Sequence, residues 1–261
     1  MKKIPLVQAL AWIIGSALII PGATYKVLRN SLPVTPEGPA YVRRIVQTGP
    51  QREALKTSYL AQLIGLSSDR PLLSKNLDLS LAESRLRVSP VIQRASIQLT
   101  QPDTIYIDYT VRQPVAALYD FENMAIDATG VPFPLSPFFT PKNLPEIYLG
   151  IDKMGYHQPL KGPQADLALS LLKVLQPLPM TLMRIDVSKA FSTRLSEREI
   201  ICVVEDGGYR RFLRLSAKHY PQGIGNYLQL RDKLPAKPQV IDLRLTKLGY
   251  LTSIEQTTPR S

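Results

Sequence analysis

The chain begins with an apolar segment that contains no charge. No charged residue occurs at positions 4–25, and residues 6–20 are strongly apolar. Such a run is close to the roughly 20 residues that an α-helix needs to cross the hydrocarbon core of a bilayer. Residues 1–28 are therefore expected to form a short cytoplasmic tail and one transmembrane helix. The side chains expected in the membrane are Leu6, Leu10, Trp12, Ile13, Ile14, Leu18, Ile19 and Ile20.

The main alternative for this segment is a cleaved signal peptide, which has the same basic start and apolar middle. Residues 21–24 (Pro-Gly-Ala-Thr) match the small residues of a cleavage site poorly, so a retained anchor is the preferred interpretation. The short N-terminal segment and the large remainder favour an N-terminus in the cytoplasm and a C-terminal part outside it.

Residues 29–39 predict a stiff linker, because residues 30–39 contain three prolines and no apolar periodicity. Two stretches with helical periodicity follow. Apolar positions three to five apart lie within residues 55–64, which places them on one helical face. A second helix is expected to begin near Ser80, because Ser80 and Glu83 have the spacing of a capping box, and to stop before Pro90.

The clearest alternation of apolar and polar positions lies in two later segments, residues 95–99 and 105–111. A period of two with one apolar face predicts two strands of a sheet that is covered on one side. Residues 41–48 suggest a further short strand before the helices. The sequence therefore predicts a strand–helix–helix–strand–strand module over residues 40–116, with both helices on the apolar face.

Residues 117–256 are richer in strand and turn signals. Asp206, Gly207 and Gly208 separate two apolar runs, 200–204 and 211–215, and this predicts a hairpin. Helices are expected at 164–175 and 224–234, and late strands at 240–245 and 250–254. The fold class is therefore α+β: an N-terminal transmembrane helix, the small module, and a mostly antiparallel β-domain with flanking helices. Residues 257–261 are expected to be a flexible tail.

The chain is basic, with 32 Lys and Arg against 21 Asp and Glu and a net charge of +11. Clustered positive charge is typical of nucleic-acid binding, but the clusters here are short and lie among apolar residues. No zinc spacing or RNA-binding aromatic motif accompanies them. Anionic lipid headgroups, wall polymer or acidic protein partners are therefore the preferred counterparts, and nucleic acid is not expected.

Catalytic chemistry finds little support in the sequence. Cys202 is the only cysteine and lies in an apolar run, which favours a buried side chain over a reactive thiol. The two histidines, His157 and His219, lie in turn-like segments, and Glu197 and Glu199 flank an arginine as in a solvated turn. We therefore expect no enzyme activity, no metal, no cofactor and no small-molecule substrate.

Several short motifs, taken in order, resemble the bacterial cell division family FtsQ/DivIB. Early in the chain these are Pro90-Val-Ile, Ala95-Ser-Ile, Pro102-Asp-Thr-Ile-Tyr-Ile and Val111-Arg-Gln-Pro-Val-Ala. Later ones are Asp127-Ala-Thr-Gly, Leu144-Pro to Gly150 and Ile241-Asp-Leu-Arg. The chain departs from the family pattern at Val91, where the family has Trp, at Val111, where it has Glu, and in the proline-rich residues 132–141. It therefore resembles a divergent member.

The resemblance implies a single-pass inner-membrane protein with a POTRA module, residues 40–116, and a β-domain, residues 117–256, outside the cytoplasm at the division septum. In the family, late strands of the β-domain bind the membrane-anchored division proteins FtsB and FtsL by strand addition. By position, the implied binding residues here are Leu245, Leu248, Gly249, Tyr250 and Leu251, with Arg194 as a further candidate. The resemblance also implies that the POTRA module binds other division proteins.

Three alternatives stay open at this point. One is a POTRA-type chaperone or a secretion or assembly factor of the cell envelope. Another is a wall-modifying enzyme of unrecognised type. In the third, the late strand is merely an exposed terminus that binds no partner.

Overall fold

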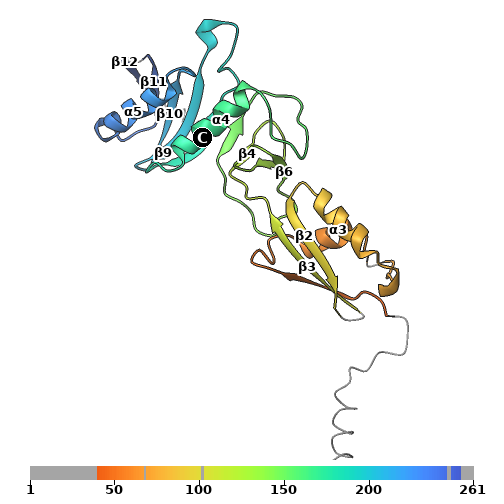
Figure 1. The fold of residues 1–261 in the computed structure, drawn as a ribbon. Coiled ribbons are helices and arrows are strands. Elements are labelled where there is room, and N and C mark those ends of the chain that lie inside the picture. Colours follow the sequence, from red (N-terminus) through yellow and green to blue (C-terminus); the bar gives the residue numbers. More distant parts are fainter. Residues whose placement is uncertain (1–39, 68, 101–102, 246–247, 254–261) are drawn as a thin grey trace, which may run out of the picture. The chain divides into compact units, whose positions relative to one another are not determined.

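The computed structural model describes residues 40–67, 69–100, 103–245 and 248–253 (Figure 1). The expected transmembrane segment 1–28, the linker 29–39 and the tail 257–261 lie outside these residues. The described residues from Tyr41 onward belong to one compact unit. The expected boundary between residues 116 and 117 therefore stays a prediction.

The expected fold class is corrected in one respect. Among the residues that the structure describes, no helix is long and apolar enough to cross a membrane. The longest of them has 13 residues, against the roughly 20 that a span requires. What the structure shows is a mixed α+β fold with a large sheet.

A three-stranded sheet and two helices form the first half of the described chain. The elements are β1 (Arg44–Thr48), α2 (Thr57–Leu63), α3 (Leu79–Val88), β2 (Ile92–Leu99) and β3 (Thr104–Val111). This is the expected strand–helix–helix–strand–strand order. The strands lie in the order β1-β3-β2, with β1 parallel and β2 antiparallel to β3.

Helix α3 begins two residues earlier than the capping-box pattern predicts. Its N-cap is Asp78, whose carboxylate accepts a hydrogen bond from the backbone N–H of Leu81 at 3.0 Å. An aspartate at this position satisfies an amide that has no partner within the helix. The predicted cap at Ser80 is therefore wrong, although both residues are good caps and lie only two positions apart.

The second sheet has nine strands in the order β12-β11-β10-β9-β8-β7-β4-β5-β6. Its short strands are β4 (Ala116–Leu118), β5 (Met124–Ile126), β6 (Pro132–Pro134) and β7 (Glu146–Tyr148). Its longer strands are β8 (Thr181–Asp186), β9 (Ile200–Asp206), β10 (Tyr209–Leu215), β11 (Gln239–Leu245) and β12 (Leu248–Ser253). Five of the eight strand pairings are antiparallel and three are parallel.

Two of the parallel pairs arise from crossover helices. Helix α4 (Pro163–Leu175) connects β7 to β8, and α5 (Tyr220–Leu230) connects β10 to β11. A parallel pair needs such a connection because the chain must return to the same end of the sheet. The expected hairpin between β9 and β10 is confirmed: Gly207 and Gly208 both have positive φ, as a two-residue turn with matching twist requires.

Both crossover helices cover one face of the nine-stranded sheet. Their apolar side chains form one cluster with alternate residues of the strands, including Ile185, Cys202, Leu213 and Ile241. At Gly223 a side chain would lie 2.8 Å from a methyl group of Leu215, so glycine lets α5 approach β10 closely. The residues that alternate with these core positions in β9, β10 and β11 are mostly only partly buried, so none of the described helices covers the opposite face.

The proline-rich residues 132–141 are part of the core of the first half. Phe133 and Phe138 belong to the same apolar cluster as Leu55 and Tyr109. Phe138 also forms a β-bridge with Leu55, and the backbone N–H of Lys56 donates to the carbonyl of Pro137 at 2.9 Å. The segment therefore joins the two sheets rather than forming an exposed turn.

Candidate functional site

The nine-stranded sheet ends in two very different strands, β6 and β12. Strand β6 has three residues, of which Pro132 and Pro134 have no backbone N–H, and Phe133 is fully buried. Strand β12 has six residues and pairs only with β11 in the described part of the sheet (Figure 1). Of these two end strands, β12 alone therefore offers a row of backbone donors and acceptors to another chain.

Side-chain exposure also distinguishes β12 from the edges of the smaller sheet. Tyr250 is 61% exposed and Leu251 is 52% exposed, while Leu245 at the end of β11 is 54% exposed. The edge strands β1 and β2 of the three-stranded sheet have no exposed large apolar side chain. Apolar groups beside an open backbone edge are the features that a partner strand can bury.

The pairing with β11 places consecutive residues of β12 on opposite faces. Tyr250 lies opposite Asp242, on the face that the helices leave uncovered, and Leu251 lies opposite the buried Ile241. The register shifts between Asp242 and Leu245, and Leu245 then pairs with Leu248. The Leu248 side chain lies outside the described part of the structure.

Gly249 is also among the predicted binding residues, and the structure gives no reason why this position must be glycine. Its φ is not positive, and an added Cβ would lie 3.4 Å from a methyl group of Leu243, which is ordinary contact. The predicted role of Gly249 in binding is untested, and it could involve only the backbone of this residue.

A shallow cleft of about 440 Å³ lies between the end of β11 and the 3₁₀ turn Leu195–Glu197. It brings together Leu245 and Tyr250, which were predicted from the sequence. Arg198 and Arg244 also line it, and the sequence analysis missed both. Arg244 ends the Asp-Leu-Arg motif, so a signal for it was present, whereas Arg198 lies in a segment without one.

Arg194 lies beside this cleft rather than in it. It precedes the 3₁₀ turn, is largely exposed, and forms an ion pair with Glu197 at 3.0 Å. The side chain of Arg198 donates to the backbone carbonyl of Ser192 at 2.6 Å. Arg198 has no acidic partner among the described residues, so its charge stays available to a ligand.

Two residues that line the cleft, Asp242 and Arg244, belong to a balanced group of charges. Arg214 contacts Glu199 at 2.5 Å and Asp242 at 3.2 Å, and Arg244 contacts Asp242 at 2.7 Å. Burial acts to raise the pKa of Asp242, but hydrogen bonds from Arg244 and the charge of Arg214 outweigh burial and keep this pKa below its usual value. The hydrogen bond to Asp242 in turn raises the pKa of Arg244.

This group holds two arginines and two carboxylates, so its charges cancel. The excess charge at the cleft is therefore positive and comes from Arg198.

Neither the models of known protein families nor the curated proteins give a match to this chain.

Of the residues considered for catalysis, Glu197 and Glu199 form ion pairs with arginines beside this cleft, whereas Cys202 and the two histidines lie elsewhere. Cys202 is fully buried in β9, and burial raises the pKa of its thiol to about 12. His219 is the N-cap residue of α5, and His157 lies in a loop with positive φ. Within the described residues, no three side chains of His, Cys, Asp or Glu are grouped as a metal site requires. These positions offer no arrangement of an acid, a base and a nucleophile.

Proposed function

We propose that this chain is a non-catalytic scaffold of the bacterial division machinery. It acts outside the cytoplasm at the division site, where it binds FtsB/FtsL-type division proteins through β12 and links septal wall synthesis to division. The observation that supports the proposal most directly is that β12 is an open strand with exposed apolar side chains at the end of a nine-stranded sheet.

Strand addition explains how such an edge gives both affinity and selectivity. Each backbone hydrogen bond to a partner strand contributes about 1 kcal/mol net, so a few of them account for modest binding. Alternate side chains of the partner then meet Tyr250 on one face and Leu251 on the other. A partner with apolar residues at both kinds of position buries the exposed groups of this edge.

Charge gives a second element of selectivity. Arg198 lacks an acidic partner among the described residues, and Arg194 is exposed beside it. An acidic side chain next to the partner's strand would therefore be favoured, and a basic one would be repelled.

The proposal is tested with a fluorescent copy of the full chain, followed by microscopy and by purification of bound proteins. We expect a band at mid-cell in dividing cells and recovery of FtsB/FtsL-type proteins. Uniform labelling of the envelope, with none of these proteins recovered, would show that the function is different. Recovery of unfolded outer-membrane proteins instead would favour the chaperone alternative.

A further inference from the structure

The nine-stranded sheet is incomplete between β7 and β8. These strands pair only from Glu146 opposite Arg184 to Tyr148 opposite Asp186. Residues 181–183 at the start of β8 therefore have a strand partner on one side alone, which is β9. No backbone hydrogen bond joins them to residues 143–145 within the described chain. The sheet thus has a short internal stretch of unpaired strand.

The register of β8 is also irregular at this point. A shift between Leu182 and Arg184 leaves Met183 as an extra residue against β9. Such bulges are frequent where a strand ends its pairing or presents a side chain at a functional site.

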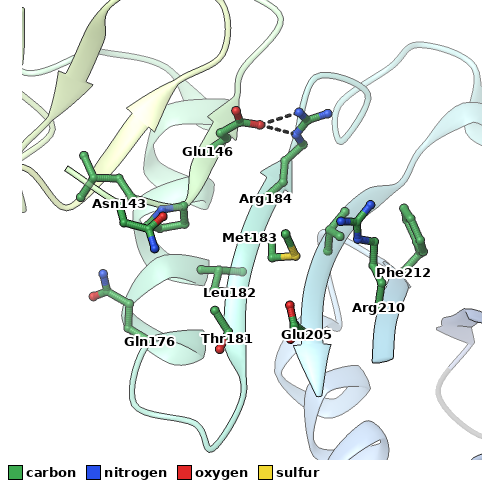
Figure 2. Close-up of a pocket in the computed structure, with 13 residues that line it drawn as sticks. Asn143, Glu146, Gln176, Thr181, Leu182, Met183, Arg184, Glu205, Arg210 and Phe212 are labelled. Atoms are coloured by element: carbon green, nitrogen blue, oxygen red, sulfur yellow. Dashed lines mark hydrogen bonds and ion pairs between the residues drawn. The ribbon is translucent and has the colours of Figure 1, made fainter. Parts of the chain in front are cut away.

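An open groove of about 700 Å³ surrounds residues 181–183. Figure 2 shows the side chains of Asn143 and Gln176 on one side of β8, and those of Glu205, Arg210 and Phe212 on the other. At one end of the groove, Arg184 and Glu146 form an ion pair at 2.5 Å (Figure 2). Apolar side chains of β8, β9 and β10 also line the groove: Leu182, Val203 and Phe212.

Four polar side chains of the groove have unused binding capacity. Those of Asn143, Gln176, Glu205 and Arg210 form no hydrogen bond or ion pair with another residue in the described part of the chain. Glu205 and Arg210 lie directly opposite each other on β9 and β10 and are both exposed. The groove therefore offers one free acidic group, one free basic group and two free amides beside unpaired backbone.

We propose that this groove binds a short extended peptide of another protein, one that contains both a basic and an acidic side chain. The unpaired backbone of residues 181–183 forms hydrogen bonds with the backbone of the peptide. A glycan has no peptide backbone and cannot form this pairing. Only a few such bonds fit, so the charged side chains must add affinity: a basic residue pairs with Glu205 and an acidic one with Arg210. This site does not use β12, so it goes beyond the proposed function and stands independently of it.

The test uses a random peptide library displayed on phage and selected on the immobilised full chain. We expect selected peptides to contain residues of both charges and to lose about tenfold or more in affinity for Glu205→Lys and for Arg210→Glu. Matched charge reversals at exposed positions outside the groove, Glu122→Lys and Arg94→Glu, should leave affinity unchanged. Proline substitutions in β12 should leave it unchanged as well.

Four results would overturn the inference. The first is that the library yields no binding peptide, and the second is that the groove and control variants lose affinity equally. The third is that the β12 variants abolish binding. The fourth is that soluble wall glycan fragments bind the groove while peptides do not. None of these outcomes depends on whether the chain localises to the division site.

Discussion

Asp206, at the end of β9, links the β9–β10 hairpin to α5 and to the 3₁₀ turn that follows it. Its carboxylate accepts a hydrogen bond from the hydroxyl of Tyr227 at 2.6 Å and pairs with Arg231 at 2.7 Å. Burial and this hydrogen bond raise the pKa of Tyr227. Because the carboxylate is almost fully buried, its charge must be balanced by these partners.

Asp206→Asn is therefore expected to lower the free energy of unfolding by about 3 kcal/mol, since it leaves the Arg231 charge with only its longer ion pair to the exposed Asp232, at 3.8 Å. Urea unfolding measured by circular dichroism tests this. Asp232→Asn is the matched control: Asp232 is 91% exposed, so its change should stay within about 0.5 kcal/mol. Equal effects of the two substitutions would contradict the assigned role.

Asp127 gives a prediction about acid stability. Burial acts to raise its pKa, but hydrogen bonds from Thr129, the Val131 amide and Arg112 outweigh burial and lower it. A carboxyl group whose pKa is lower in the folded state stabilises the protein above its unfolded-state pKa of about 3.9, and the contribution is lost as the pH falls below that value. The stability of the native chain should therefore fall between pH 5 and pH 2.

Asp127→Asn separates this contribution from other acidic groups. The variant should be less stable than the native chain by about 1–3 kcal/mol at pH 7, and the difference should shrink as the pH falls below about 4. Denaturant midpoints of the two proteins, measured at pH 7 and again below about pH 4, test this. A difference that is the same at both would contradict the lowered pKa.

At the scale of single elements, β12 allows a test of strand addition. Consecutive residues of an edge strand direct their N–H groups alternately toward the neighbouring strand and away from the sheet. Of Tyr250→Pro and Leu251→Pro, one therefore removes a donor to β11 and the other removes a donor to the partner.

We expect one of these variants to lose at least about tenfold in affinity for an FtsB/FtsL-type partner, with little change in the stability of the chain. The other should mainly lower stability. Affinity is measured by titration with the purified partner, and stability by thermal unfolding. Unchanged affinity in both variants would contradict strand addition at β12.

The longer elements could be predicted from the sequence because their patterns are regular. Alternation in β2 and β3 and helical spacing in α4 give boundaries within a few residues of those observed. The β9–β10 hairpin follows from two adjacent glycines, which permit a turn that other residues disfavour. The open edge could be predicted only through resemblance to a family, since no local pattern distinguishes an edge strand from a central one.

Other features had no readable pattern. Strands β4 to β7 have only three residues each, which is too short for periodicity to show. The groove beside residues 181–183 arises because β7 is shorter than β8, and this depends on pairing between distant segments. Arg198 and Tyr250 line the same cleft for the same reason: the fold brings them there, and no fixed spacing in the sequence reveals it.

At the scale of the whole described unit, one apolar cluster extends from the first sheet into the second. Phe133 is fully buried within it, together with Leu55 and Tyr109 of the first half. Because the strand pair β5–β6 and the first sheet share this core, the two halves are expected to unfold together.

Phe133→Ala should lower the free energy of unfolding by about 3–5 kcal/mol, because it leaves a cavity in this shared core. Hydrogen exchange of amides in both β3 and β9 should accelerate to the same extent. Phe139→Ala is the control, since Phe139 is 70% exposed and its loss should have little effect. Faster exchange in β3 alone would show that the halves unfold separately.

The two prolines of β6 have a consequence for self-association. A molecule whose sheet accepts new strands at both ends can join copies of itself into an unlimited fibre. Here β6 closes the other end of the nine-stranded sheet, so strands cannot be added at both of its ends. Growth through the two ends of this sheet therefore stops after a single addition.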